Sequence, residues 1–193
     1  PAVLIPRPET VVLIDLALEK LRRLEAPRVL DLGTGSGIVA ISLALECPAA
    51  TAVAVDLSPP AILVARNNAR RLGATIDFRV GDWFAPVTGE PFDLVVANPP
   101  SVAAGAPHLE ADGLPFEPRL ALTGESADGD GLACIRAIVA GAPAHLGPGG
   151  WLLFEHGYDQ GQASRNLLTQ AGFQSPSTFP DLAGIDRVSG AHI

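Results

Sequence analysis

Short hydrophobic runs alternate along the chain with longer amphipathic segments. The runs are typical of buried strands, which we expect at residues 28–32, 51–55, 76–80, 92–97 and 151–155, with two more in the tail 173–193. Apolar residues at helical spacing predict helices over residues 8–24, 38–47, 59–72, 130–146 and 160–171. Strands that alternate with helices in this way form a parallel sheet covered on both faces. The pattern therefore predicts a doubly wound α/β fold with a seven-stranded, mostly parallel sheet.

Local signals mark the ends of several of these elements. Ser58 is the expected N-cap of the third helix, with Pro59 at its first helical position. Gly73 is the expected left-handed C-cap of the same helix. The glycine- and proline-rich residues 147–150 predict a turn that leads into the fifth strand.

A single catalytic domain is expected over residues 1–193, because a chain of this length can bury its own hydrophobic core. Residues 1–25 contain the first helix. Residues 101–128 are polar and rich in proline and glycine, and loops of that length in compact domains are usually functional. We expect this segment to be a loop or hairpin insertion on the substrate side.

The residues that end successive strands are suited to hold a nucleoside-like ligand. In parallel sheets the ligand crevice lies beyond the carboxyl ends of the strands, where the strand order reverses. Asp56 ends the second strand, where a carboxylate can accept both ribose hydroxyls, and Trp83 follows the third, where its ring can stack on adenine. Glycines after the first strand let a ligand approach the backbone amides. That turn consists of Gly33, Thr34, Gly35, Ser36 and Gly37.

The glycine spacing distinguishes two kinds of cofactor. The dinucleotide fingerprint requires a third glycine where this chain has Ile38, and the chain offers no evident hydride-transfer partner. The Gly-x-Gly-x-Gly pattern instead resembles that of class I methyltransferases with their Rossmann-like fold. This resemblance implies S-adenosyl-L-methionine as cofactor and S-adenosyl-L-homocysteine as product.

Asn98, Pro99 and Pro100 end the fourth strand beside the expected cofactor crevice. The prolines fix φ and remove two backbone donors, so that nearby carbonyls and the Asn98 side-chain oxygen can accept hydrogen bonds from a substrate. That arrangement suits a planar nitrogen with two N–H groups, such as a carboxamide or an exocyclic amine. Catalysis would then depend on positioning and fixed dipoles rather than on a strong base.

Charge and composition narrow the possible partners. The formal net charge of −8, from 13 basic and 21 acidic side chains, argues against direct binding of nucleic acid. No apolar run approaches the roughly 20 residues that cross a bilayer, and the N-terminus does not resemble a signal peptide, so we expect a cytoplasmic protein.

Glu155, which ends the fifth strand, either touches the site or belongs to a solvated rim. We expect no metal site, and surface or helix-end positions for His108, His145, His156 and His192.

Several segments together resemble the protein-glutamine methyltransferases of the HemK/PrmC type, and the likeness spans essentially the whole chain. Asn-Pro-Pro is shared with adenine-N6 methyltransferases, whereas the early Pro-Arg-Pro-Glu-Thr and the Glu-Pro-x-x-Ala-Leu segments are more specific. The resembling segments are residues 5–10, 31–37, 81–84, 98–100, 116–122, 130–132 and 183–188.

The resemblance implies N5-methylation of a glutamine in the Gly-Gly-Gln loop of a peptide chain release factor. By the same resemblance Gly33 to Gly37, Asp56, Trp83 and Asn98 hold the cofactor. Asn98, Pro99, Pro100 and Ser101 hold the glutamine amide.

The chain departs from the family pattern at three points. Ser101 stands where family members usually carry tyrosine, so an aromatic wall over the amide would come from elsewhere, with Phe116 as one option. Val11 replaces an acidic residue. The N-terminal helical domain of the family has no counterpart in these residues. Three alternatives remain open: an adenine-N6 nucleic-acid methyltransferase, a small-molecule N-methyltransferase, and a non-catalytic module that binds S-adenosylmethionine.

Overall fold

The computed structural model describes Val3, residues 7–101 and residues 129–193. Its strands are β1 (Arg28–Leu32), β2 (Thr51–Asp56), β3 (Asp77–Val80), β4 (Phe92–Ala97), β5 (Leu146–Glu155), β6 (Gln174–Pro180) and β7 (Asp186–His192). Its α-helices are α1 (Thr10–Leu21), α2 (Ile38–Glu46), α3 (Pro59–Leu72), α5 (Ala133–Gly141) and α6 (Gly161–Gln170). The described residues also contain the short 3-10 helices η1 (Ala85–Val87) and η4 (Ala142–Ala144).

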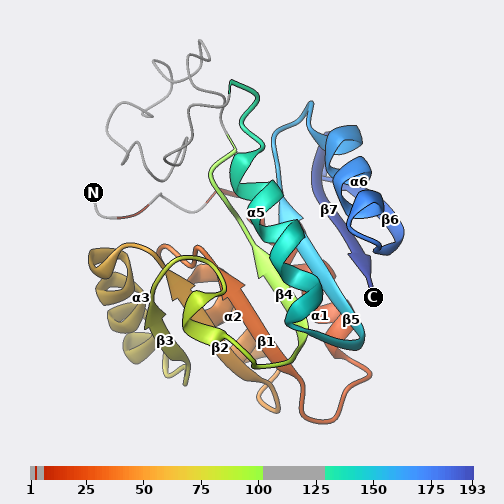
Figure 1. Ribbon diagram of the computed structural model, residues 1–193. Coiled ribbons are helices and arrows are strands. Elements are labelled where there is room, and N and C mark those ends of the chain that lie inside the picture. Colours follow the sequence, from red (N-terminus) through yellow and green to blue (C-terminus); the bar gives the residue numbers. More distant parts are fainter. Residues whose placement is uncertain (1–2, 4–6, 102–128) are drawn as a thin grey trace.

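In the described residues the strands form one seven-stranded sheet in the order β3-β2-β1-β4-β5-β7-β6 (Figure 1). Strands β1 to β5 are parallel, and β7 runs antiparallel to both of its neighbours. The chain winds outward from β1 to β3 and then returns to the other side of β1 with β4. This reversal of strand order between β1 and β4 is where α/β sheets bind their ligands. The predicted fold class is confirmed.

Alternation along the central strands divides the core between the two faces of the sheet. Leu30 and Leu32 of β1 belong to the cluster that includes α5 and α6. Val29 of β1 belongs instead to the cluster that includes α1 and α2. Fully burying one such side chain contributes roughly 1.5–3 kcal/mol. Both faces are therefore stabilised by apolar burial, and the carboxyl edge of the sheet is left for polar residues.

Both predicted ends of the third helix are confirmed. The Ser58 side chain accepts a hydrogen bond from the Ala61 backbone N–H at 3.3 Å, as an N-cap does. Gly73 closes the same helix with φ of +78°, a left-handed conformation that favours glycine. These two caps fix the length of α3, which covers the edge of the sheet formed by β2 and β3.

The helix expected over residues 130–146 is shorter than predicted. The Asp130 side chain accepts a hydrogen bond from the Leu132 backbone N–H at 3.0 Å, so Asp130 lies ahead of α5 rather than inside it. At the other end Pro143 has no N–H to donate, and the chain closes with the 3-10 turn η4 instead of continuing the α-helix. None of the helices among the described residues is long and apolar enough to cross a membrane.

The turn expected at residues 147–150 is incorporated into a strand. Strand β5 begins at Leu146, and its pairing with β4 shifts register between Phe92 and Leu94, so the glycine-rich residues bulge out of that ladder. The backbone of Gly149 and Gly150 hydrogen-bonds instead with Ile193, at 3.1 Å in each direction. A distant partner at the C-terminus, which no local pattern reveals, therefore extends this strand.

Some expectations fall on residues outside the described part of the chain. They are the insertion at 101–128 beyond Ser101 itself, the family-like segment at 116–122 with Phe116, His108, and the first residues of the segment at 5–10.

Candidate active site

The glycine-rich turn after β1 is tied to the neighbouring strand. The backbone N–H groups of Gly33 and Thr34 both donate to the Val55 carbonyl, at 2.9 and 3.0 Å. Gly33 and Gly35 have φ of +70° and +55°, which side-chain-bearing residues rarely adopt. A Cβ on Gly33 would also lie 3.7 Å from the Trp83 ring. The backbone of the turn is thus accessible to a ligand, and the Trp83 ring lies next to Gly33.

Asp56, at the end of β2, is bound to this turn through both of its carboxylate oxygens. Oδ2 accepts from the Gly35 backbone N–H at 2.8 Å, and Oδ1 accepts from the Ser58 backbone N–H at 2.9 Å. Each carboxylate oxygen can accept a second hydrogen bond. Asp56 therefore shapes the turn and the start of α3 while keeping acceptor capacity for a ligand.

Asp31, inside β1, is a buried carboxyl group beneath the turn, with 2% of its surface exposed. Its Oδ2 accepts from the Thr34 hydroxyl at 2.7 Å and from the Ala40 backbone N–H at 3.2 Å. Burial raises the pKa of Asp31 to about 6 against the lowering effect of these two hydrogen bonds, and the negative charge of Asp56 adds to the rise. A cation placed nearby would favour the ionised form.

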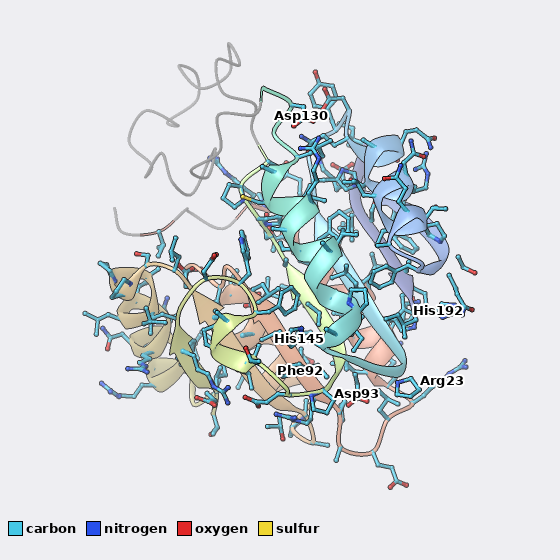
Figure 2. All side chains as sticks on the ribbon, in the orientation of Figure 1. Arg23, Phe92, Asp93, Asp130, His145 and His192 are labelled. Atoms are coloured by element: carbon cyan, nitrogen blue, oxygen red, sulfur yellow. The ribbon has the colours of Figure 1, made fainter. Side chains whose placement is uncertain are left out.

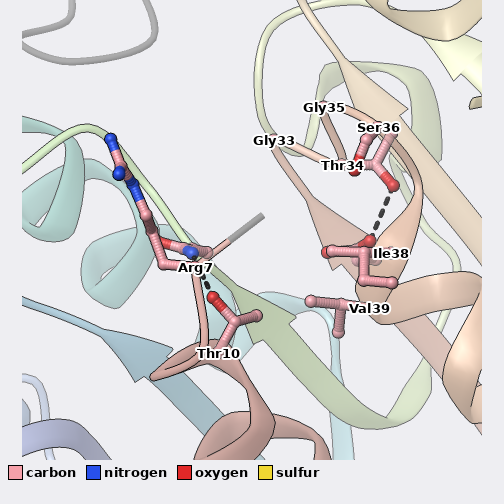
Figure 3. A pocket seen from close by; sticks show the side chains of 10 residues that line it. Arg7, Thr10, Gly33, Thr34, Gly35, Ser36, Ile38 and Val39 are labelled. Carbon is pink, nitrogen blue, oxygen red and sulfur yellow. Dashed lines mark hydrogen bonds between the residues drawn. The ribbon is translucent and has the colours of Figure 1, made fainter. Parts of the chain in front are cut away.

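These elements enclose one side of a pocket, and the N-terminal segment encloses the other (Figure 3). Figure 3 shows Arg7 and Thr10 on one side, facing the turn from Gly33 to Ser36 on the other. The pocket is lined by Arg7, Thr10, Asp31, Gly33, Thr34, Gly35, Ser36, Ile38, Val39 and Asn98. Its walls thus combine the turn after β1 with the residue that follows β4, the two strands between which the sheet order reverses.

Asn98 reaches the pocket at the end of β4 and is held by hydrogen bonds from the protein side. Its Nδ2 donates to Thr10 Oγ1 at 3.2 Å, and the Thr10 hydroxyl donates to Glu155 Oε2 at 3.0 Å. Of the two possibilities left open for Glu155, the structure therefore favours contact with the site. Figure 2 shows Asp130 at the same end of the sheet, and Phe92, Asp93 and His145 at the opposite end, where β4 begins.

The predicted site residues are brought together to different degrees. Gly33 to Ser36 and Asn98 line the pocket, and Asp56 and Trp83 contact the turn. Gly37 packs away from the pocket, since a Cβ there would meet Ile41 and Ala65 on the helix side. Pro99, Pro100 and Ser101 follow Asn98 but do not line this pocket.

The carbonyl of Ser101 is engaged by the protein itself. Gln160, which is 7% exposed, donates through Nε2 to the carbonyls of Ser101 and Asp130, at 3.0 and 3.1 Å. Its Oε1 accepts from the Gly157 backbone N–H at 2.8 Å. Gln160 was not identified from the sequence. It stands at the start of an expected helix, where a polar residue is common and does not indicate a bond to Ser101. Arg7 and Thr10 belonged to the family-like segment but were assigned no function.

The expectation of a surface or helix-end position is wrong for His156. It is 2% exposed, and its ring nitrogens hydrogen-bond the Gly157 carbonyl at 2.8 Å and Ser189 Oγ at 2.9 Å. Burial lowers the pKa of His156, which favours the neutral ring. Among the described residues no cluster of His, Cys, Asp or Glu is arranged to hold a metal ion.

Comparison with known proteins identifies a family and a fold. Residues 14–111 match the family model described as "Methyltransferase small domain". Among solved structures, a 16S rRNA N2 G1207 methyltransferase from T. thermophilus, in complex with AdoMet and guanosine, superposes with a TM-score of 0.72 at 22% identity, covering 97% of this chain and 43% of that one.

Closer relatives are found among curated sequences. A release factor glutamine methyltransferase of Bordetella pertussis is 50% identical over 194 residues, which cover 100% of this chain and 71% of the relative. That of Neisseria gonorrhoeae is 49% identical over 191 residues, covering 98% of this chain and 68% of the relative. With the glycine turn, Asp56 and Asn98 gathered at the sheet's switch point and identity at this level along the chain, the protein belongs to the release factor glutamine methyltransferase family.

Proposed function

We propose that this protein transfers a methyl group from S-adenosyl-L-methionine to the side-chain nitrogen N5 of a glutamine in the Gly-Gly-Gln loop of a peptide chain release factor. One observation carries the proposal: Asn98, at the start of Asn-Pro-Pro, lines the same pocket as the glycine turn. A nitrogen held at Asn98 would therefore lie beside the cofactor. The names of the relatives at about half identity support the same reaction and substrate.

The cofactor pocket offers complementary groups for each part of S-adenosyl-L-methionine. We assign the ribose hydroxyls to Asp56, whose oxygens keep acceptor capacity, and the adenine to the Trp83 side of the turn. The methionine part carries positive charge, which suits the buried carboxyl group of Asp31. The open backbone of Gly33 and Gly35 admits the ligand without a Cβ in its way.

Asn98 and the two prolines would hold the acceptor amide. An amide nitrogen is a poor nucleophile because its lone pair is delocalised into the carbonyl. When bound, the cofactor would supply a methyl group on a positively charged sulfur: the amide lone pair would attack the methyl carbon as the S–CH3 bond breaks, the sulfur would leave as the neutral thioether of S-adenosyl-L-homocysteine, and the nitrogen would lose one N–H proton to water. Asn98 Oδ1 accepts one N–H of the glutamine, and a carbonyl of the Pro99–Pro100 segment accepts the other, which turns the lone pair toward the methyl group. Such alignment can supply up to about 7 kcal/mol of the barrier.

A protein substrate fits this chain better than a nucleic acid. The net charge of −8 argues against binding to a phosphate backbone, which requires basic side chains to displace its counterions. Ser101 also lacks the aromatic ring on which a flipped base would stack. Because release factors act at ribosomes, the proposed substrate places the activity in the cytoplasm.

The substrate assignment is tested by mass spectrometry of peptides incubated with enzyme and S-adenosyl-L-methionine. A release-factor peptide with Gly-Gly-Gln should gain one methyl group on the glutamine, and the matched Gly-Gly-Asn peptide none, because its amide is one methylene too short to reach Asn98. A single-stranded oligonucleotide rich in adenine serves as the third arm. Equal labelling of both peptides, or of the oligonucleotide alone, would refute the proposal.

The division of labour within the site is tested with two variants. Asn98→Ala should reduce turnover by about 100-fold or more while its calorimetric affinity for S-adenosyl-L-methionine stays within about threefold of wild type. Asp56→Ala should weaken that affinity by at least about tenfold, since it removes an ionised hydrogen-bond acceptor from the site. The opposite pattern would show that the two residues have been assigned to the wrong parts of the pocket.

A further inference from the structure

Three residues from distant parts of the chain form one hydrogen-bonded chain beside the pocket. Asn98 Nδ2 donates to Thr10 Oγ1 at 3.2 Å, and Thr10 donates to Glu155 Oε2 at 3.0 Å. Asn98 also lies close enough to Glu155 to lower the pKa of that carboxyl group. Thr10 begins α1 and is 3% exposed, while Asn98 and Glu155 follow or end the parallel neighbours β4 and β5. This network therefore occupies the side of Asn98 that faces away from the pocket.

The chemistry of these groups permits one orientation of the Asn98 amide. An ionised carboxylate is only an acceptor, so Glu155 takes the single hydrogen of the Thr10 hydroxyl. The Thr10 oxygen can then only accept from Asn98. Thr10 accordingly requires the NH2 group of Asn98 rather than its carbonyl oxygen. A flipped amide would place Oδ1 against the lone pairs of the Thr10 oxygen, which is repulsive, and would leave NH2 facing the pocket.

The charge on Glu155 is governed by its surroundings. Burial raises the pKa of Glu155 to about 6; the Thr10 hydrogen bond opposes the rise, the negative charge of Glu9 adds to it, and Arg187 and Asn98 oppose it. Arg187 lies 4.0 Å from Glu9 Oε1 and also donates from Nε to Asp181 at 3.0 Å. Arg187 therefore shares its charge among several carboxylates, and Glu155 remains the group in this network that titrates near neutral pH.

We propose that Thr10 and Glu155 are positioning residues that hold Asn98 with its NH2 group toward the protein and its Oδ1 toward the acceptor amide. The inference rests on the proposed function, in which Oδ1 accepts an N–H of the glutamine. It assigns to the first residue of α1 and the last residue of β5 a role in orienting the acceptor site. When Glu155 takes up a proton, its carboxyl group becomes a donor, and the flipped amide is no longer disfavoured.

A matched pair at Thr10 tests the orientation. Thr10→Ser keeps the hydroxyl, and Thr10→Val keeps the shape but removes it. At saturating cofactor, Thr10→Val should lower kcat about tenfold, the equivalent of one lost hydrogen bond, whereas Thr10→Ser should stay within about threefold of wild type. The calorimetric affinity for S-adenosyl-L-methionine should be unchanged in both. Equal losses in the two variants, or a loss confined to cofactor affinity, would overturn the proposal.

Glu155→Gln tests the role of charge. In the wild type, kcat/KM for the Gly-Gly-Gln peptide, measured with the cofactor saturating at every pH, should fall as the pH drops through about 6. In Glu155→Gln that acid limb should vanish, and the value at pH 8 should be about 10- to 100-fold below wild type because the amide is no longer held in one orientation. An acid limb that persists unchanged in the variant would contradict the role of Glu155.

A readout without catalysis separates this proposal from the proposed function. The side-chain NH2 signal of Asn98 in ¹⁵N-labelled protein, identified by its loss in Asn98→Ala, should be protected from exchange with water in wild type and Thr10→Ser. In Thr10→Val its exchange should be about tenfold faster. If the wild type fails to methylate the peptide but shows this protection, the substrate assignment fails and the Asn98 orientation stands. Rapid exchange in the wild type refutes the orientation itself.

Discussion

Replacing Asp31 by asparagine should change how the stability of the protein depends on pH. In the folded protein burial raises the pKa of Asp31 from 3.8 to about 6. Between these pH values the folded protein therefore keeps a proton on Asp31 that the unfolded chain releases. The resulting contribution to the free energy of unfolding is fully present below pH 4 and is lost as the pH rises through about 6. This rise in pKa corresponds to about 3 kcal/mol, of which about 2 kcal/mol falls between pH 4.5 and 7.5.

An asparagine side chain at this position would stay neutral throughout. The free energy of unfolding of Asp31→Asn, taken relative to that of the wild type, should therefore rise by about 2 kcal/mol between pH 4.5 and pH 7.5. Urea unfolding of both proteins at several pH values measures this difference, and the titration of Glu155 cancels because both proteins contain it. Asp15→Asn is the control, because Asp15 is exposed on α1. A difference between Asp31→Asn and wild type that does not vary with pH would show that Asp31 titrates normally in the folded state.

Two further predictions concern the frame around the site. Gly37→Ala should lower the free energy of unfolding in urea by about 2–4 kcal/mol, because alanine is strained in the left-handed backbone and its Cβ is crowded. Gly73 has a similar φ but open space around it, so Gly73→Ala should lower that free energy by only about 1–2 kcal/mol. Equal losses in the two variants would exclude the crowding. Gln160→Leu should raise KM for the Gly-Gly-Gln peptide in steady-state assays, because the Ser101 carbonyl loses its donor, and Gln162→Leu on the exposed face of α6 should not. An unchanged KM in Gln160→Leu would show that Gln160 has no role in binding the acceptor peptide.

Much of the fold followed from local patterns because its causes are local. The alternation at Leu30 and Leu32 is a property of strand geometry, and a capping serine or a left-handed glycine acts within one helical turn. The residues that we propose for the cofactor side could also be found in the sequence, since glycine turns and acidic residues at strand ends lie next to their strands in sequence. Asp56 and the turn are joined by a hydrogen bond that the parallel pairing of β1 and β2 makes available.

Other features were decided only when the chain folded. Strand β5 starts at Leu146 because the glycine-rich bulge finds its backbone partners at Ile193, and α5 ends before Pro143 in a 3-10 turn. The contact of Thr10 with Glu155 joins residues 145 positions apart. Sequence by itself therefore determined the class of fold, the glycine turn and the place of Asn98 directly after β4. Tertiary structure decided which polar groups lie beside Asn98, because hydrogen-bond partners far apart in sequence are chosen by the packing of the sheet and not by any local pattern.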